Sequence, residues 1–289
     1  MTPGISTLIP GPRDKFINEV LAIEALAAKE AGAIGYMARA LVQATMPHRK
    51  REGAEFTRRN GAFTLSLLAP SHVGLPYGSI PRLLVSWVTT EAVRTGEREL
   101  VLGDNLSQFM RELGMVPTGG RWGTVTRLRD QMRRLFASSI IYTDDRATGF
   151  GVNTRPIADS AWLWWDPKRP DQAALWESTL KLGEQFFDDI TRSPVPIDLR
   201  ALKALKRSPM ALDIYCWLTY RLSYLRKPTV IPWAALQIQL GAEYGRARDF
   251  KAGFVSALRK VLCIYRANVE EHANGLLIKP SRTHIPRCA

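Results

Sequence analysis

The sequence predicts a mainly helical α+β protein that contains two tandem domains of one kind. Three observations support this: apolar residues recur mostly at helical spacing, two basic helices each follow a Gly-containing turn, and one order of elements occurs twice. The chain has 289 residues, of which 46% are hydrophobic, so a sizeable core is expected. We expect an N-terminal helix and basic linker over 1–62, a first domain over 63–195 and a second over 196–289.

The N-terminal region contains one clear helical pattern between two irregular segments. Residues 1–13 are rich in Gly and Pro and are expected to be disordered. Apolar residues then repeat at helical spacing from Asp14 to about Gln43. The basic cluster Met46–Arg51 fits either an arm that contacts phosphates or a merely soluble tether.

The first domain is predicted from its apolar periodicity and its turn residues. The expected elements are a strand over 63–67, helices over 79–96 and 106–113, a strand over 98–102, an Arg-rich helix ending at 136, and a hairpin with strands over 139–143 and 162–165. A further strand is expected over 174–181, and residues 183–190 are expected to be helical or irregular. The order of helix, strand, helix, turn, helix and hairpin is that of a winged helix-turn-helix.

The second domain repeats this order at low sequence identity. It starts with the segment 199–205, and its expected elements are helices over 208–222 and 233–240, a strand over 230–232, a basic helix over 246–262, and a hairpin with strands over 263–269 and 275–279. Two basic helices in equivalent places favour DNA binding more strongly than one, because a single Arg-rich helix is often only a solvated surface helix.

Charge and composition narrow the function classes. The formal net charge is +13, which favours a polyanionic partner, nucleic acid first and an anionic membrane surface second. The three cysteines have no metal-ligand spacing, and Cys216 and Cys263 are expected to be buried thiols in a reducing compartment. No apolar run reaches about 18 residues, so no transmembrane helix is expected and a cytoplasmic location is predicted.

The sequence carries no recognisable catalytic or cofactor-binding motif. The sequence contains no phosphate-binding Gly-x-x-x-x-Gly-Lys-Ser/Thr motif, and its four histidines are scattered. We therefore expect no metal, no cofactor and no enzymatic activity. Trp162, Trp164 and Trp165 fit either a base-stacking platform or a strand packed on the core, and packing is the favoured interpretation.

The central block resembles a known family. Gly74-Leu75-Pro76-Tyr77-Gly78, the helix from Pro81 to Gly96, and Gly119-Gly120-Arg121-Trp122-Gly123-Thr124 are similar to the plasmid-encoded RepA replication initiators. The resemblance extends over most of the chain from about Met37. It implies binding to directly repeated origin sequences (iterons), help in opening the duplex, recruitment of host proteins such as an initiator or helicase, and in some members homodimers that repress their own promoter.

The candidate DNA-binding residues lie on the two basic helices, in the turns before them, and in or after the hairpins. Thr126 and Ser256 are expected to touch base edges, and the hairpin residues to contact phosphates. The full predicted set is Arg121, Thr126, Arg127, Arg129, Arg133, Arg134, Arg155, Arg246, Arg248, Ser256, Arg259, Lys260, Arg266, Lys279 and Arg282. A transcriptional repressor of the same fold is the first alternative, and an enzyme with an unrecognised site is the second.

Overall fold

The first of two helical units begins with a long helix. The computed structural model describes residues 12–61, 63–146, 149–174, 177–241 and 244–286 of this α+β chain. The first unit comprises α3 (Ser79–Thr95), β4 (Glu99–Val101), α4 (Leu106–Glu112), α5 (Thr124–Phe136), β7 (Ala158–Trp162) and β8 (Thr179–Leu182). Asn105 caps α4 by accepting a hydrogen bond from the backbone N–H of Gln108 at 2.8 Å. Its three strands form an antiparallel sheet in the order β4-β8-β7.

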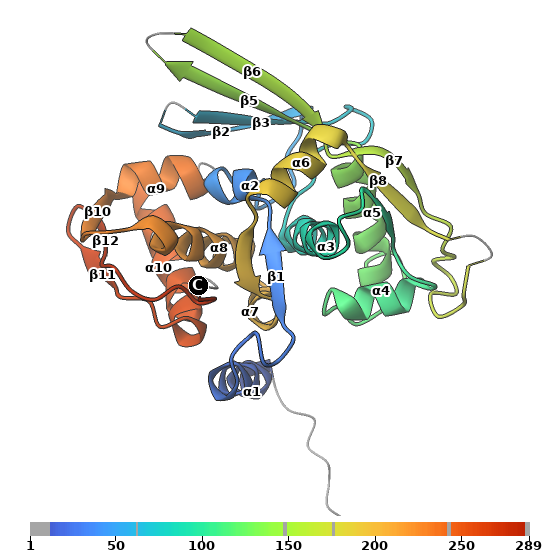
Figure 1. Cartoon of the computed structure of the whole chain (residues 1–289), viewed down its shortest axis with the longest axis horizontal. Helices are drawn as coiled ribbons and strands as arrows, with labels where there is room; N and C mark the ends of the chain where they lie inside the picture. The colour runs from blue at the N-terminus through green and yellow to red at the C-terminus, as the bar shows by residue number, and fades with distance from the viewer. Residues whose placement is uncertain (1–11, 62, 147–148, 175–176, 242–243, 287–289) are drawn as a thin grey trace, which may run out of the picture.

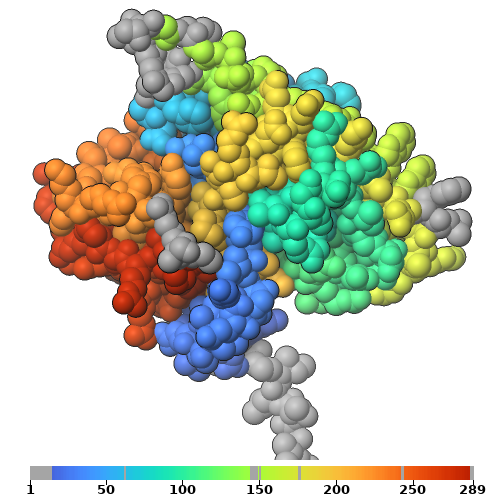
Figure 2. All heavy atoms as spheres, viewed as in Figure 1, coloured from blue at the N-terminus to red at the C-terminus, as the bar shows by residue number. Residues whose placement is uncertain are grey.

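The second unit has the same order of elements. It comprises α8 (Pro209–Tyr224), β10 (Thr229–Pro232), α9 (Trp233–Leu240), α10 (Ala247–Ile264), β11 (Val269–His272) and β12 (Gly275–Ile278). Ser208 caps α8 through the backbone N–H of Ala211 at 3.2 Å. Its sheet has the order β10-β12-β11. In both units, therefore, the strand that comes last in the chain lies in the middle of the sheet, between the other two. The two units lie on opposite sides of the N-terminal segment (Figures 1 and 2).

The hairpin after α5 belongs to a separate sheet, which corrects one prediction. β5 (Ser139–Arg146) pairs with β6 (Gly149–Pro156) on one side and with β3 (Phe63–Leu68) on the other, and β2 (Glu55–Asn60) completes the sheet. The expected return strand over 162–165 is therefore wrong. The sheet of the first unit takes β7 and β8 instead, and β8 is shorter than the strand expected over 174–181. α6 (Glu184–Arg192) confirms the helical alternative for that segment.

The N-terminal segment is interrupted where one continuous helix was expected. α1 (Pro12–Ala25) is followed by β1 (Ile34–Met37) and α2 (Arg39–Gln43). β1 pairs with β9 (Val195–Asp198), which leads directly into α7 (Leu199–Leu205). Gly35 lies so close to Leu199 that an added Cβ would overlap that side chain, which explains the glycine at this crossing. Of the predicted disordered residues, Pro12 and Arg13 begin α1, and residues 1–11 lie outside the described part.

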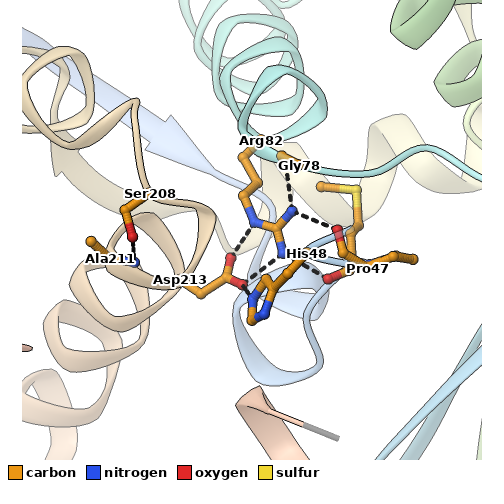
Figure 3. A network of polar contacts seen from close by, with 8 residues as sticks. Pro47, His48, Gly78, Arg82, Ser208, Ala211 and Asp213 are labelled. Carbon is orange, nitrogen blue, oxygen red and sulfur yellow. Dashed lines mark hydrogen bonds and ion pairs between the residues drawn. The ribbon is translucent and has the colours of Figure 1, made fainter. Parts of the chain in front are cut away.

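A buried polar network joins the two units (Figure 3). Arg82 of α3 donates from Nε to Oδ1 of Asp213 on α8 at 2.6 Å and from Nη2 to Oδ2 at 2.7 Å. Its other N–H groups donate to the carbonyl oxygens of Met46, Pro47 and Gly78. All five guanidinium donors are thus used, which satisfies a side chain that is only 1% exposed.

The network also assigns a structural place to the basic cluster after α2. Nε2 of His48 lies 2.7 Å from Oδ2 of Asp213, while the carbonyls of the two preceding residues bind Arg82. Burial opposes ionisation of Asp213, but the charge of Arg82 and the hydrogen bonds from His48 and Arg82 outweigh it and lower the pKa of Asp213. Residues 46–48 are therefore part of the joint between the units, whereas Arg49, Lys50 and Arg51 are exposed and both expected roles stay open for them.

Candidate nucleic-acid interface

The basic helix of the first unit is amphipathic as predicted. Its buried residues are Val125, Leu128, Gln131, Met132, Leu135 and Phe136. Thr126, Arg127, Arg129 and Arg133 are exposed, as is Arg121 in the preceding turn. None of these four arginines makes an ion pair with another described residue. The helix therefore carries uncompensated positive charge on its outer side.

The turn before α5 is held by a reciprocal pair of threonines. The backbone N–H of Thr118 donates to Oγ1 of Thr124 at 2.8 Å, and the backbone N–H of Thr124 donates to Oγ1 of Thr118 at 2.9 Å. Gly123 packs against the carbonyl groups of Thr118 and Gly119 so closely that a Cβ would overlap them. The first turn of α5 is consequently fixed in position relative to the end of α4.

Arg134 differs from its neighbours on α5 in its orientation, which corrects its predicted place on the outer side of the helix. Its Nε donates to Oδ2 of Asp130 at 2.8 Å, and its guanidinium lies 5.6 Å from the centre of the Tyr77 ring. Only 14% of the side chain is exposed. The helical pattern placed Arg134 on the outer side, but tertiary packing turns it toward the segment before α3.

The basic helix of the second unit presents a comparable surface. Phe250, Phe254, Ala257, Leu258, Val261 and Ile264 of α10 are buried. The predicted contact residues Arg246, Arg248, Ser256, Arg259 and Lys260 are all exposed. Cys263, which was expected to be buried, is exposed near the end of the same helix, whereas Cys216 is buried as predicted.

Most of the predicted hairpin contacts are engaged within the protein. Arg155 forms an ion pair with Asp189 of α6 and lies over the ring of Tyr142, in the sheet that is not part of either unit. Its charge is thus already paired within the protein, away from the two basic helices. Arg266 pairs with Glu24, and Lys279 pairs with Glu270 across β12 and β11. Arg282 is exposed beyond β12.

A set of cations missed in the sequence connects the two basic helices. A cavity of about 640 Å³ beside α5 includes Arg127 among its lining residues, and a cavity of about 310 Å³ beside α10 includes Lys260. Both cavities are also lined by three shared cations: Lys15, Lys206 and Arg207. We call these three residues the cationic bridge. Two of them lie at the end of α7, and no regular charge pattern in the sequence indicates that α1 brings a third beside them.

The electrostatic environment of Lys206 shows how closely these charges gather. Burial lowers the pKa of Lys206, Glu19 raises it, and the neighbouring charges of Lys15, Arg207 and Lys203 lower it further. Its Nζ donates to the carbonyl oxygen of Gly114, at the end of α4, at 2.5 Å. Glu19, which also lines the smaller cavity, offsets part of this charge, and a bound anion such as a phosphate group would offset more of it.

Two of the three clustered tryptophans are exposed, contrary to the favoured interpretation. Trp165 is buried and donates from Nε1 to the Gly103 carbonyl at 3.3 Å. Trp162 and Trp164 are 58% and 50% exposed, and their rings stack nearly parallel with centres 6.0 Å apart. Packing on the core thus accounts for Trp165 alone. In the turn before α5, Trp122 is 80% exposed.

In the part of the chain that the structure describes, no three or more His, Cys, Asp or Glu side chains gather in a way that suits a metal ion. None of the described helices combines the length and the apolar character that crossing a membrane requires.

A family model described as plasmid encoded RepA protein matches residues 75–234, which is more than half of the chain. The chain belongs to the family of plasmid-encoded RepA proteins. The matched span runs from the segment before α3 to the start of α9, so it is narrower than the resemblance expected from about Met37. In this RepA-family chain, α10 and its hairpin lie outside the match. No curated protein matches the chain.

Solved structures share the fold of this RepA-family chain. A crystal structure of domains 2 and 3 of RctB aligns with a TM-score of 0.56 at 12% sequence identity, covering 83% of this chain and 95% of that one. A second RctB structure of domains 2–3 aligns with a TM-score of 0.50 at 11% identity, covering 83% and 96%. At such identities the likeness concerns the fold alone.

Proposed function

We propose that this protein is a non-enzymatic replication initiator that binds repeated origin DNA through two winged helix-turn-helix domains. The single observation that carries the proposal is the pair of exposed basic helices, α5 and α10, at equivalent places in two units of the same topology. The +13 net charge and the RepA family support it. The structural similarity to a chain that comprises domains 2 and 3 of RctB supports treating the two units of this chain as two domains.

In this proposal α5 and α10 enter two major grooves of one duplex. A helix fits the major groove, and Arg side chains bind guanine edges and phosphates. Arg129, Arg133 and Thr126 contact DNA from the first domain, and Arg248, Ser256 and Arg259 from the second. The cationic bridge lies between the two helices and binds the backbone of the intervening DNA, so the protein covers roughly two turns of duplex.

The geometry supports a role for Lys260 and Arg127 in phosphate binding. Each lines a cavity shared with the cationic bridge, on the flank of its helix. Such contacts position the protein on the backbone without distinguishing bases. We also propose that origin opening, recruitment of host replication proteins and self-association follow DNA binding, as the family membership suggests.

Footprinting of the purified full chain on the DNA flanking its own gene tests the proposal. A protected array of direct repeats, each about two helical turns long, is the expected result. Plasmid maintenance with and without the protein then separates an initiator from a repressor that binds the same sites. Absence of any sequence-specific protection, at salt concentrations where nonspecific binding is weak, would contradict the proposal.

A further inference from the structure

The exposed indole of Trp122 lies in the turn just before the N-terminus of the cationic helix α5. It is the most exposed of the large hydrophobic side chains in the described part of the chain, at 80%. Isolated exposed hydrophobic residues are common on protein surfaces, so exposure alone does not indicate a function. The surroundings of Trp122 supply the further observations.

First, the backbone that carries Trp122 is held in place by hydrogen bonds. The N–H of Gly123 donates to the carbonyl of Gly120 at 3.1 Å, and Oγ1 of Thr126 donates to the same carbonyl at 2.9 Å. The Thr118–Thr124 pair closes the turn from the other side. The indole is therefore presented to solvent by an ordered turn.

Second, one face of the indole is already occupied by a cation. The guanidinium carbon of Arg121 lies 5.2 Å from the centre of the Trp122 ring. No other ring of the described residues stacks on Trp122. Because the side chain is still 80% exposed, its opposite face is open to a planar ligand.

Third, the charge around Trp122 selects the ligand. Arg121 is exposed in the same turn as Trp122, and Arg129 and Arg133 are exposed on α5. The one acidic residue of that helix, Asp130, is paired with Arg134. An apolar protein partner gains little from this concentration of positive charge, whereas a nucleic acid brings phosphates for the arginines and planar bases for the ring.

Resting on the proposed function, we infer that Trp122 stacks on a base that leaves the helical stack when the origin duplex is bound. The base lies on the indole face opposite Arg121, which yields a layered arrangement of guanidinium, indole and base. Arg121 then faces the adjoining backbone phosphate. Within a closed duplex only base edges are accessible from the groove, so face-to-face contact requires local unstacking. This contact would couple recognition of the repeat by α5 to distortion of the DNA.

The test uses the full chain, the duplex repeat defined by footprinting, and 2-aminopurine placed in turn at successive positions of that repeat. Trp122→Leu keeps an apolar side chain but removes the aromatic plane, and Trp122→Phe keeps a plane. Tyr224→Ala is the matched control, because Arg221 lies 5.2 Å from the Tyr224 ring in a similar pair on α8, remote in sequence from α5. Fluorescence anisotropy measures affinity, and 2-aminopurine emission measures unstacking.

We expect Trp122→Leu to weaken repeat binding by roughly 5- to 150-fold and to abolish the 2-aminopurine increase that the parent produces at positions flanking the displaced base, which lose a stacking neighbour. Trp122→Phe and Tyr224→Ala should retain both signals. If the parent binds the repeat but Trp122→Leu binds and unstacks it equally well, the Trp122 inference fails and the proposed function stands. If the parent binds without any emission increase, base stacking is wrong even where affinity falls. A parent that binds no repeat overturns the proposed function itself, and the inference with it.

Discussion

Arg82 and Asp213 form a two-point ion pair that joins the first long helix of one unit to that of the other. The pair is buried, and every N–H group of Arg82 has an acceptor. A buried ion pair gains little over a well-packed apolar pair, but removing one partner leaves the other charge without compensation. This contact therefore helps to fix α3 relative to α8.

Replacing Arg82 with Met should lower the free energy of unfolding by about 3–5 kcal/mol, because the buried Asp213 loses its cationic partner and three carbonyl groups each lose one donor. Urea denaturation measures the change. The double variant Arg82→Met with Asp213→Leu should recover part of the loss. Arg94→Met is the control, since Arg94 is 70% exposed and its pair with Glu91 should contribute about 0–0.5 kcal/mol. If the free energy of unfolding of the Arg82→Met protein were within about 1 kcal/mol of the parent's, the network would not stabilise the fold as argued.

Adjacent arginines on α5 should behave differently in DNA binding. Arg133→Ala should cost about 1–3 kcal/mol of binding to the origin repeat and relax the sequence preference, because Arg133 is exposed and has no acidic partner among the described residues. Arg134→Ala should leave the preference unchanged and instead reduce stability, since its side chain pairs with Asp130. Anisotropy titrations on the repeat and on singly changed repeats measure both effects. Equal losses of affinity and preference from the two variants would contradict the assignment.

The cationic bridge should make a salt-dependent contribution to DNA affinity that does not depend on the DNA sequence. Arg207→Gln should reduce the slope of log affinity against log salt concentration by about 0.9, on specific and nonspecific duplexes alike. Arg94→Gln, at the far end of α3 from the bridge, is the control and should leave the slope unchanged. A change confined to the specific repeat would instead indicate that Arg207 contacts a base.

The partly buried His284 should make the protein less stable in mild acid. Its Nδ1 lies 2.7 Å from Oη of Tyr215, and burial lowers the pKa of His284, with Asp198 opposing and Arg200 adding to this shift. The unfolded chain, with a histidine pKa of about 6.5, therefore binds more protons than the folded protein once the pH falls below that value. Stability that is present above about pH 6.5 is then lost as the pH falls toward the folded pKa.

Urea midpoints measured from about pH 7.5 down to about pH 5 check this effect. His284→Asn removes the titrating group and should flatten the profile in that range. The lowered pKa of Asp213 acts only at lower pH, below its usual range near 3.9, so the two contributions are separable. A parent whose midpoint is constant over the whole range would contradict the assignment of His284.

Local signals predicted the helices of the two units well, because such signals act within a few residues. The apolar spacing of α5 and α10 and the capping residues Asn105 and Ser208 require only neighbouring backbone groups. The hairpin after α5 was misassigned because strand pairing is not local. β5 is paired by β3 from a distant part of the sequence, and nothing within β5 specifies that partner.

The candidate interface was predicted in part for the same reason. Helical periodicity identified Arg129 and Arg133, whose exposure follows from their position on the helix. It could not show that Asp189 lies beside Arg155, or that Tyr77 and Asp130 surround Arg134. The cationic bridge likewise depends on the docking of α1 against α7, which joins residues remote in sequence.

The sequence by itself determined the charge of this protein, its family, the repeated order of its helices and the outer faces of the two basic helices. These properties follow from composition and from the 3.6-residue period, both of which are local. Only the tertiary structure decided which arginines keep their charge unpaired, which sheet receives each hairpin, and how Arg82 holds the two units together. Those outcomes depend on contacts between residues far apart in the chain, where packing and charge pairing select among partners of equal local propensity.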